Sequence, residues 1–387
     1  MEIEELGRIL MAGEDSKHQF KENIKSPDKL AAEMIAFSNG DGGHIFVGVN
    51  DLGLITGLGD SDVRRLNQMI SNVASNHIHP PINPVTENLV TDKGIVLAIT
   101  IIQGVNRPYH DNGGAYWVKN GSDKRKVTSR EELQRLFQSS GLIHADEALI
   151  PNMSISDLDM NYFSAFFEKR YGESLDDQLL PLPQVINNLN IGNNGLLNLS
   201  GALLFATNPS VKLPAFIVKA GAFYDLTLAT TEYRDSRDIA GKLAEIFRQT
   251  VNFVLSNIHH RQGGQNVNSL GIPEIPAVTI EELVANALIH RDYYISSPVR
   301  VFVFPDRVEI ISPGHLPNNL TVENIKAGNS NTRNPVLASF ANHLLPYRGY
   351  GSGIIRALAA YPHVIFEDDH DGNKFKVTIR RIQETAI

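Results

Sequence analysis

The last third of the chain, from about Thr279 to Arg381, has an order of predicted elements that constrains the fold more than any other feature. A helix is followed by two strands, a Ser-Pro-Gly turn, a long segment, a glycine-rich turn, a second helix and two closing strands. Glycine-rich backbone directly before a helix exposes amide hydrogens towards an anion, and the helix dipole adds to the attraction. The order indicates a mixed α/β domain with an anion-binding turn.

The length of 387 residues exceeds what one ordinary core organises, so two or three domains are expected. No run of 18 apolar residues predicts a membrane span, and the acidic, amphipathic N-terminal segment does not resemble a signal peptide. The sequence contains no cysteine, which excludes disulfides and thiol chemistry. A cytoplasmic protein without a membrane partner is expected.

Glycine and proline positions divide the chain into three predicted parts: residues 1–145, a connector at 146–236, and residues 237–387. The first part mixes short strands with two or three helices, which is typical of a small α+β domain. Residues 182–206 suggest a helix–turn–helix, but the second segment has no basic face that could enter a DNA groove. A connector packed between domains is the favoured interpretation of that segment.

A formal net charge of −8 argues against a protein that binds nucleic acid with its whole surface. The segment 119–130, KNGSDKRKVTSR, nevertheless concentrates basic residues. It is either a solvated loop beside a helix or a local patch that contacts phosphates.

Two short patterns in the last third predict a nucleotide site. Glu282 and Asn286 are one helical turn apart and project from the same face, where the amide oxygen could hold magnesium and the carboxylate could orient water. Gly349, Gly351 and Gly353 precede an apolar helix. Each pattern is common by itself, and neither the P-loop nor the dinucleotide-binding pattern occurs.

Together with NALIHRDY, VEIISPGHLP and Arg333-Asn334-Pro335, these patterns resemble the GHKL superfamily of ATP-binding domains. They also resemble the divergent GHKL-like domain found in transcriptional regulators and helicase-related proteins. The resemblance implies a Bergerat-type (GHKL) α/β sandwich that binds ATP with Mg²⁺, with a lid at 318–348 and Glu282 as general base. The implied nucleotide contacts are Asn286, which also holds the metal, Arg291, Ser312, Gly314, Arg333, Gly349, Gly351, Ser352 and Gly353.

One departure from the GHKL pattern concerns recognition of the adenine base. GHKL proteins place an aspartate before the first glycine-rich turn to accept a hydrogen bond from the adenine amine, whereas the stretch at 310–314 of this chain reads IISPG, with Ser312 and no carboxylate. Adenine selectivity and hydrolysis are therefore open, and His290 and Asp292 could be site residues or structural. None of the 13 histidines lies in a pattern such as H-E-x-x-H, so no metal site beyond magnesium is expected.

Residues 14–58 resemble the Schlafen AlbA-like domain, through Phe20-Lys21-Glu22, the run AFSNGDGG at 36–43, and Val47-Gly48-Val49. Members of that family bind nucleic acid, and some cleave RNA with three carboxylates. The matching positions are Glu14, Gln19 and Asp51, so the neutral Gln19 breaks the trio and nuclease activity is not expected. A role in binding DNA or RNA would instead depend on Lys17, Lys21, Lys119, Lys124, Arg125 and Lys126.

The resemblances imply an ATP-binding, nucleic-acid-binding transcriptional regulator that forms a homo-oligomer, in which nucleotide state controls the N-terminal domain or assembly. Two alternatives stay open. The chain could be an enzyme, a weak ATPase or a Schlafen-like nuclease, or a nucleotide-sensing interaction module without a nucleic-acid partner.

Overall fold

A computed structural model describes residues 3–261, 271–317, 320–347, 349 and 351–382. The chain forms two compact units, residues 1–142 and 143–387. Each unit has its own hydrophobic core, and the predicted connector at 146–236 contributes to the core of the second unit.

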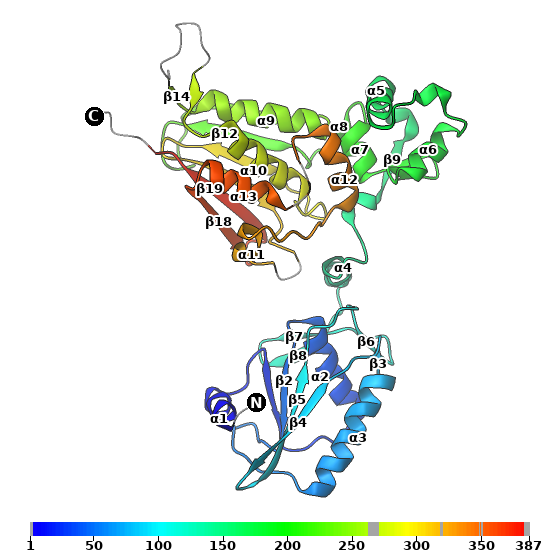
Figure 1. Cartoon of the computed structure of the whole chain (residues 1–387), viewed down its shortest axis with the longest axis vertical. Coiled ribbons are helices and arrows are strands. Elements are labelled where there is room, and N and C mark those ends of the chain that lie inside the picture. The colour runs from blue at the N-terminus through cyan, green and yellow to red at the C-terminus, as the bar shows by residue number, and fades with distance from the viewer. Residues whose placement is uncertain (1–2, 262–270, 318–319, 348, 350, 383–387) are drawn as a thin grey trace. The chain divides into compact units, whose positions relative to one another are not determined.

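The first unit is built on a four-stranded sheet in the order β1-β2-β5-β4 (Figure 1). β1 and β2 are parallel, and the other neighbours are antiparallel. The elements of this unit are α1 (Ile3–Ala12), β1 (His18–Lys21), α2 (Pro27–Asn39), β2 (Gly43–Val47), α3 (Asp60–Asn76), β3 (Ile78–His79), β4 (Val85–Thr91), β5 (Gly94–Ile101), β6 (His110–Asp111), β7 (Trp117–Asn120), β8 (Asp123–Lys126) and α4 (Arg130–Ser139).

Alternation along β2 explains why helices cover both faces of this sheet. Ile45 and Val47 are buried in one core with residues of α2 and α3, whereas Phe46 is buried in a second core with Leu6 of α1. Side chains that alternate along a strand point to opposite faces, so an uninterrupted apolar run requires cover on both sides. Ser26 caps α2 by accepting a hydrogen bond from the Lys29 amide.

The second unit contains a six-stranded sheet in the order β13-β12-β16-β17-β19-β18, in which only the β12–β16 pair is parallel among the described strands. Its elements begin with η1 (Ala145–Glu147), β9 (Leu149–Ser154), η2 (Ile155–Asp157), α5 (Met160–Tyr171), η3 (Leu175–Asp177), α6 (Leu182–Asn188), β10 (Gly192–Asn193), β11 (Leu196–Asn198), α7 (Leu199–Phe205) and α8 (Pro209–Lys212). They continue with β12 (Val218–Phe223), β13 (Tyr233–Ile239), α9 (Leu243–Asn257), β14 (His260–Arg261), β15 (Ile272–Pro273), α10 (Ala277–Ile289), β16 (Val299–Val303), β17 (Arg307–Pro313), α11 (Val322–Lys326), α12 (Pro335–Leu344), α13 (Ser352–Ala360), β18 (Val364–Asp369) and β19 (Lys374–Arg380).

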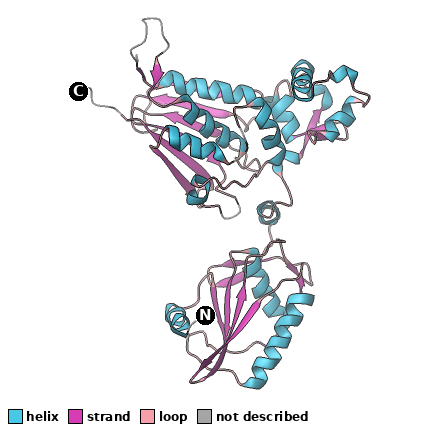
Figure 2. Cartoon of the chain, viewed as in Figure 1, coloured by secondary structure: helices cyan, strands magenta, loops and turns pink. Residues whose placement is uncertain are grey.

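Helices α9, α10 and α13 lie together on one face of the six-stranded sheet (Figures 1 and 2). The order α10, β16, β17, α13, β18, β19 matches the predicted order of elements, and the mixed architecture confirms the predicted α+β class. The predicted lid is partly helical, because α11 and α12 lie within it; residues 318–319 and 348 of that lid lie outside the described residues.

The helix–turn–helix interpretation of 182–206 fails in the structure. The strands β10 and β11 separate α6 from α7, and every residue of α7 is buried. A helix without an exposed face cannot enter a groove of DNA. No helix within the described part of the chain is long and apolar enough to cross a membrane.

Candidate functional site

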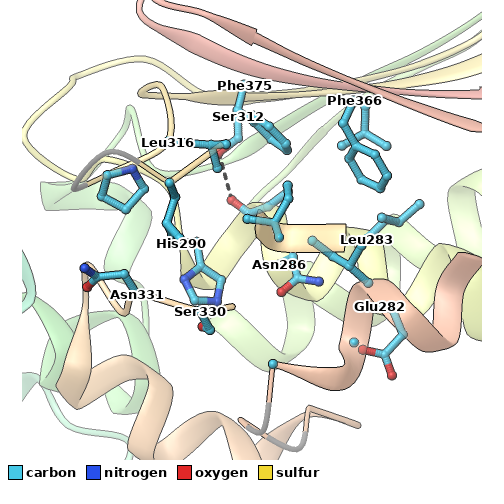
Figure 3. Close-up of a pocket in the computed structure, with 18 of the residues that line it drawn as sticks. Glu282, Leu283, Asn286, His290, Ser312, Leu316, Ser330, Asn331, Phe366 and Phe375 are labelled. Carbon is cyan, nitrogen blue, oxygen red and sulfur yellow. Dashed lines mark hydrogen bonds between the residues drawn. The ribbon is translucent and has the colours of Figure 1, made fainter. Parts of the chain in front are cut away.

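A pocket in the second unit lies between α10, the sheet and the start of α13 (Figure 3). Its sheet side is apolar, with Ile310, Phe366, Phe375 and Val377, and its helix side carries the polar residues Glu282, Asn286 and His290. The last three recur every fourth residue, so they share one face of α10, with His290 as its C-cap residue. This arrangement combines an apolar floor with a few convergent polar groups, as small-molecule sites do.

Asn286 is the polar residue of this pocket with the clearest unmet hydrogen-bonding capacity. Its side-chain amide nitrogen is buried and has no hydrogen-bond partner among the described residues. A buried polar group without a partner costs about 1–3 kcal/mol. Because the Asn286 side chain faces a pocket, a ligand in that pocket could remove this cost.

Glu282 is almost fully buried, at 3% exposure, and its carboxylate forms an ion pair with Arg356 of α13 at 2.5 Å. This contact places a positive charge directly on the predicted general base. Sequence reasoning missed Arg356, since its position after the glycine-rich turn carries no pattern of its own. The pairing of α10 with α13 becomes visible only in the fold.

The glycine-rich turn leads into α13, as its sequence predicts. Gly349 and Gly351 have φ angles of 71° and 69°, and Gly351 is the N-cap residue of α13. A Cβ atom on Gly353 would lie 2.6 Å from Glu282 Oε2 and 3.4 Å from Asn286 Nδ2. All three glycines line the pocket, whereas Ser352 is not among the lining residues.

Ser312 and Gly314 both line the pocket near the end of β17. The Ser312 hydroxyl donates a hydrogen bond of 3.0 Å to the Ala287 carbonyl (Figure 3). Its proton is therefore directed into the protein, and its oxygen keeps acceptor capacity. Gly314 has a φ of 94°, and a Cβ atom there would lie 2.5 Å from Arg333 Nη1, so close packing with Arg333 also requires glycine.

The two arginines predicted to contact phosphate do not line the pocket. Arg291 is buried, donates to the carbonyls of Ile295 and Ser297, and packs against the rings of Phe216 and Tyr293. These contacts use the guanidinium for the structure of the unit, which corrects the predicted ligand role. Arg333 is likewise engaged internally, because its Nη2 donates to the carbonyl of the pocket residue His315 at 2.9 Å.

His290 and Tyr347 form a hydrogen bond of 3.0 Å at one side of the pocket. Burial, with a smaller contribution from the Arg333 charge, lowers the pKa of His290 to about 4. The imidazole is therefore neutral at neutral pH. Burial also raises the pKa of Tyr347, and the Glu282 charge adds to that effect. Both groups serve as neutral hydrogen-bonding partners.

In the first unit, two of the three residues of the predicted broken trio are in contact. Gln19 Nε2 donates to Glu14 Oε1 at 2.6 Å, and Lys119 Nζ donates to Gln19 Oε1 at 2.9 Å. Glu14 Oε1 also accepts from the Phe20 amide, and Lys21 Nζ lies 3.7 Å from it. Among the described residues, the His/Asp/Glu groups spaced to hold a metal include neither Glu14 nor Asp51.

Part of the predicted basic patch is neutralised within the unit. Lys124 pairs with Glu33 at 2.6 Å, and Arg125 pairs with Glu132. Burial lowers the pKa of Lys119, whose ammonium also lies over the Phe37 ring. Lys17, Arg125 and Lys126 are exposed, and of these three Arg125 is the one paired with Glu132.

Comparison with known families finds two matches along the chain. Residues 14–128 match the family model described as "Schlafen, AlbA_2", and residues 296–379 match the one described as "Putative ATP-dependent DNA helicase recG C-terminal". The second match begins after α10, so Glu282 and Asn286 precede it. No curated protein sequence matches the chain.

Two solved structures are similar at 21% identity. One is the DIP2311 protein from Corynebacterium diphtheriae, with a TM-score of 0.47 and coverage of 98% of this chain and 80% of that one. The other is the N-terminal domain of a RecG-related protein from Nitrosomonas europaea, with a TM-score of 0.23 and coverage of 33% and 92%. By its two family matches, the chain carries an N-terminal Schlafen AlbA_2 domain and a C-terminal domain of the recG C-terminal type.

Proposed function

We propose that the pocket of the second unit binds ATP with Mg²⁺. The observation that carries the proposal is the buried Asn286 Nδ2 donor, which has no acceptor among the described residues and lies beside the glycine-rich turn, where a phosphate oxygen could accept from it. The family matched at 296–379 carries the description "Putative ATP-dependent DNA helicase recG C-terminal", which supports a nucleotide as the ligand. Among ligands of this kind, a triphosphate with a hard cation uses both an amide oxygen and exposed backbone amides.

The base would lie over the apolar side of the pocket, against Phe366, Phe375 and Ile310. Ser312 is positioned there with its hydroxyl proton committed to Ala287, which leaves a lone pair to accept a hydrogen bond. The adenine amine is a suitable donor, so the serine supports adenine without the carboxylate that the GHKL pattern contains. A neutral acceptor gives a weaker bond than a carboxylate, and discrimination against guanine is correspondingly modest.

Asn286 would hold Mg²⁺ through its side-chain oxygen, and Gly349, Gly351 and Gly353 would surround the phosphates. Magnesium bound there would neutralise phosphate charge. Glu282 is the candidate base for hydrolysis, but its ion pair with Arg356 reduces its capacity to accept a proton from water. We therefore favour nucleotide binding with slow turnover over a fast ATPase.

A thermal-shift experiment with and without magnesium tests this site. ATP with Mg²⁺ at about 100 times its Kd should stabilise the second unit by about 2.7 kcal/mol. Asn286→Ala should remove the magnesium-dependent part of that stabilisation while circular dichroism stays that of the wild type. Asn187→Ala, an exposed position on α6, is the control and should respond as the wild type does.

Retention of full magnesium-dependent stabilisation by Asn286→Ala would show that the metal role is wrong. Equal stabilisation by ATP and by every other triphosphate would keep the phosphate site and remove the adenine assignment at Ser312.

We further propose that the first unit binds DNA or RNA and that nucleotide occupancy of the second unit controls this binding or the assembly of a homo-oligomer. The Schlafen AlbA_2 match supports the nucleic-acid role. With a net charge of −8, contact must be local, through exposed cations such as Lys17 and Lys126. In this interpretation, the chain is a nucleotide-responsive regulator, whereas an interaction module without nucleic acid is the alternative.

Substitution of an exposed lysine and of a lysine with internal hydrogen bonds distinguishes the nucleic-acid-binding regulator from the interaction module. Lys126→Ala should weaken retention of DNA or RNA by a few-fold and reduce the slope of log affinity against log salt by about one. Lys119→Ala, which loses contacts with Gln19 and Ser122, should instead mainly lower the stability of the first unit. Absence of any binding at low salt would favour the interaction module.

A further inference from the structure

Three side chains that no sequence pattern connects meet beside the pocket of the second unit. His315 follows β17, Asp368 lies in β18, and His370 lies in the turn between β18 and β19. Each of them offers one ligand atom, and these atoms all lie within 4.8 Å of one another. The fold brings them together because the loop after β17 passes the turn that joins β18 to β19.

The segments that carry these side chains are held together by hydrogen bonds. The Leu316 amide donates to Asp368 Oδ1 at 2.8 Å, and the Gly314 amide donates to the Asn373 carbonyl at 2.9 Å. His370 Nε2 lies 3.0 Å from Asp368 Oδ2, and the rings of His315 and His370 are 4.4 Å apart. Such contacts orient ligands before a metal arrives.

His315 has an unmet requirement at this cluster. Its Nδ1 atom is buried and has no hydrogen-bond partner among the described residues. A ring nitrogen buried without a partner is costly, and a metal ion is one of the partners that a neutral imidazole accepts.

We propose that His315, Asp368 and His370 form a site for a first-row transition-metal dication of the zinc type. Two imidazoles with one carboxylate suit zinc and its neighbours, whereas magnesium prefers oxygen ligands throughout. Three protein ligands leave a further coordination position for water or another ligand. The site is separate from the proposed magnesium position at Asn286, and it does not depend on nucleotide binding.

The charges around the cluster are mixed. Arg333 donates to the His315 carbonyl and brings one positive charge, which opposes a cation. Asp368 is a ligand, and Asp369 and Asp371 flank His370 in sequence, although Asp369 pairs with Lys374 at 3.1 Å. The acids outnumber the bases at this turn, so a dication meets net negative charge.

A metal at this position would have a structural consequence for the pocket. His315 and Leu316 both line the pocket, so a bound ion would fix the segment after β17 against the β18–β19 turn at the rim of the pocket. The metal would thereby stabilise one wall of the nucleotide site.

The test is a zinc titration of the tag-free full-length chain without nucleotide, measured by calorimetry. Metal analysis after dialysis then counts the zinc that stays bound. One equivalent should remain bound to the wild type. His370→Ala alters an exposed side chain and should weaken zinc binding by about 10- to 100-fold or more, the range that loss of even a supporting residue causes. His363→Ala alters another exposed histidine, at the opposite end of β18, and is the control that should bind as the wild type does.

Asp368→Asn provides a second variant, because an amide oxygen still accepts from the Leu316 amide while the ligand charge is lost. It should weaken zinc binding without changing the circular dichroism spectrum. Co²⁺ added in place of zinc should give visible absorbance in the wild type that is absent from both ligand variants. A wild type that retains no zinc, or a His370→Ala variant with unchanged affinity and Co²⁺ spectrum, would overturn the proposal.

Discussion

In the first unit the Gln19 side chain bridges Glu14 and Lys119, whereas in the second unit the Asn286 amide nitrogen has no partner among the described residues. Both side chains are amides that sequence resemblance places in a ligand site. The first is satisfied by its own domain and adds stability there. The second carries a cost that a ligand could offset. Unmet polar capacity thus distinguishes the proposed nucleotide pocket from the satisfied cluster at Gln19.

The largest effect is expected at the glycine that lies beside both Glu282 and Asn286. A methyl group on Gly353 would lie 2.6 Å from Glu282 Oε2, so Gly353→Ala should displace the Glu282 carboxylate, weaken its ion pair with Arg356 and fill space at the glycine-rich turn. We expect ATP affinity to fall by about 100-fold, equivalent to about 2.7 kcal/mol, and stability to fall by about 1–3 kcal/mol. Isothermal titration and urea unfolding measure the two effects.

Gly7→Ala is the matched control for that substitution. Gly7 lies in α1 of the first unit, and a Cβ atom there would meet nothing within 4 Å. Alanine at such a helical position should stabilise by about 0.5–1 kcal/mol and leave ATP affinity unchanged. If Gly353→Ala binds ATP as the wild type does, the phosphates do not occupy the space beside α13.

The fold was predictable to the extent that local patterns determine it. The order from α10 to β19 and the turn at Gly351 follow from apolar periodicity and glycine placement. The ion pair between Glu282 and Arg356 was not predictable, since it depends on how α10 packs against α13. Arg291 shows the converse. Its charge beside a motif predicts a phosphate contact, but its guanidinium is surrounded by neighbouring carbonyls and aromatic rings and stabilises the fold instead.

The same limit applies to the cluster of His315, Asp368 and His370. The sequence places His315 far from the other two, and no ligand spacing of the H-E-x-x-H kind links them. Antiparallel pairing of β17, β19 and β18 determines which loop meets which turn. Contacts of this kind are a property of strand order, which residue spacing alone does not specify.

The second prediction concerns pH and uses two buried groups of the second unit. Burial is the main reason that the pKa of His290 is lowered from 6.5 to about 4. As the pH falls, the unfolded state therefore binds the proton before the folded state does, and stability is lost between pH 6.5 and pH 4. Burial raises the pKa of Asp146 to about 6, so there the folded state binds the proton first and stability is gained between pH 6 and 3.8. Each effect amounts to at most about 3 kcal/mol, and the two oppose each other.

Variants separate these two contributions. Relative to the wild type, Asp146→Asn should lose stability more steeply between pH 6 and 4, and His290→Gln should lose it less steeply. The asparagine can still accept from the Leu337 amide, as Asp146 Oδ2 does. Circular dichroism follows urea unfolding of the whole chain, while fluorescence of Trp117, the only tryptophan, reports the first unit. Parallel pH profiles in all three proteins would show that neither group titrates as described.

The smallest effect is expected when the satisfied cluster of the first unit is converted into an unsatisfied one. Gln19→Glu replaces the amide 2.6 Å from Glu14 Oε1 by a second carboxylate, and Lys119 balances only part of the added charge. The variant should lose about 1 kcal/mol of stability in the presence of EDTA, because two adjacent carboxylates repel. Mn²⁺ should reverse that loss of stability, because paired carboxylates bind hard cations. The stability of the wild type should not change with Mn²⁺. Trp117 fluorescence during urea unfolding measures both changes. If Gln19→Glu is as stable as the wild type and insensitive to Mn²⁺, position 19 is not the missing member of a carboxylate trio. The comparison of a satisfied ligand site in the first unit with an unsatisfied one in the second would then fail, and only the argument about Asn286 would stand.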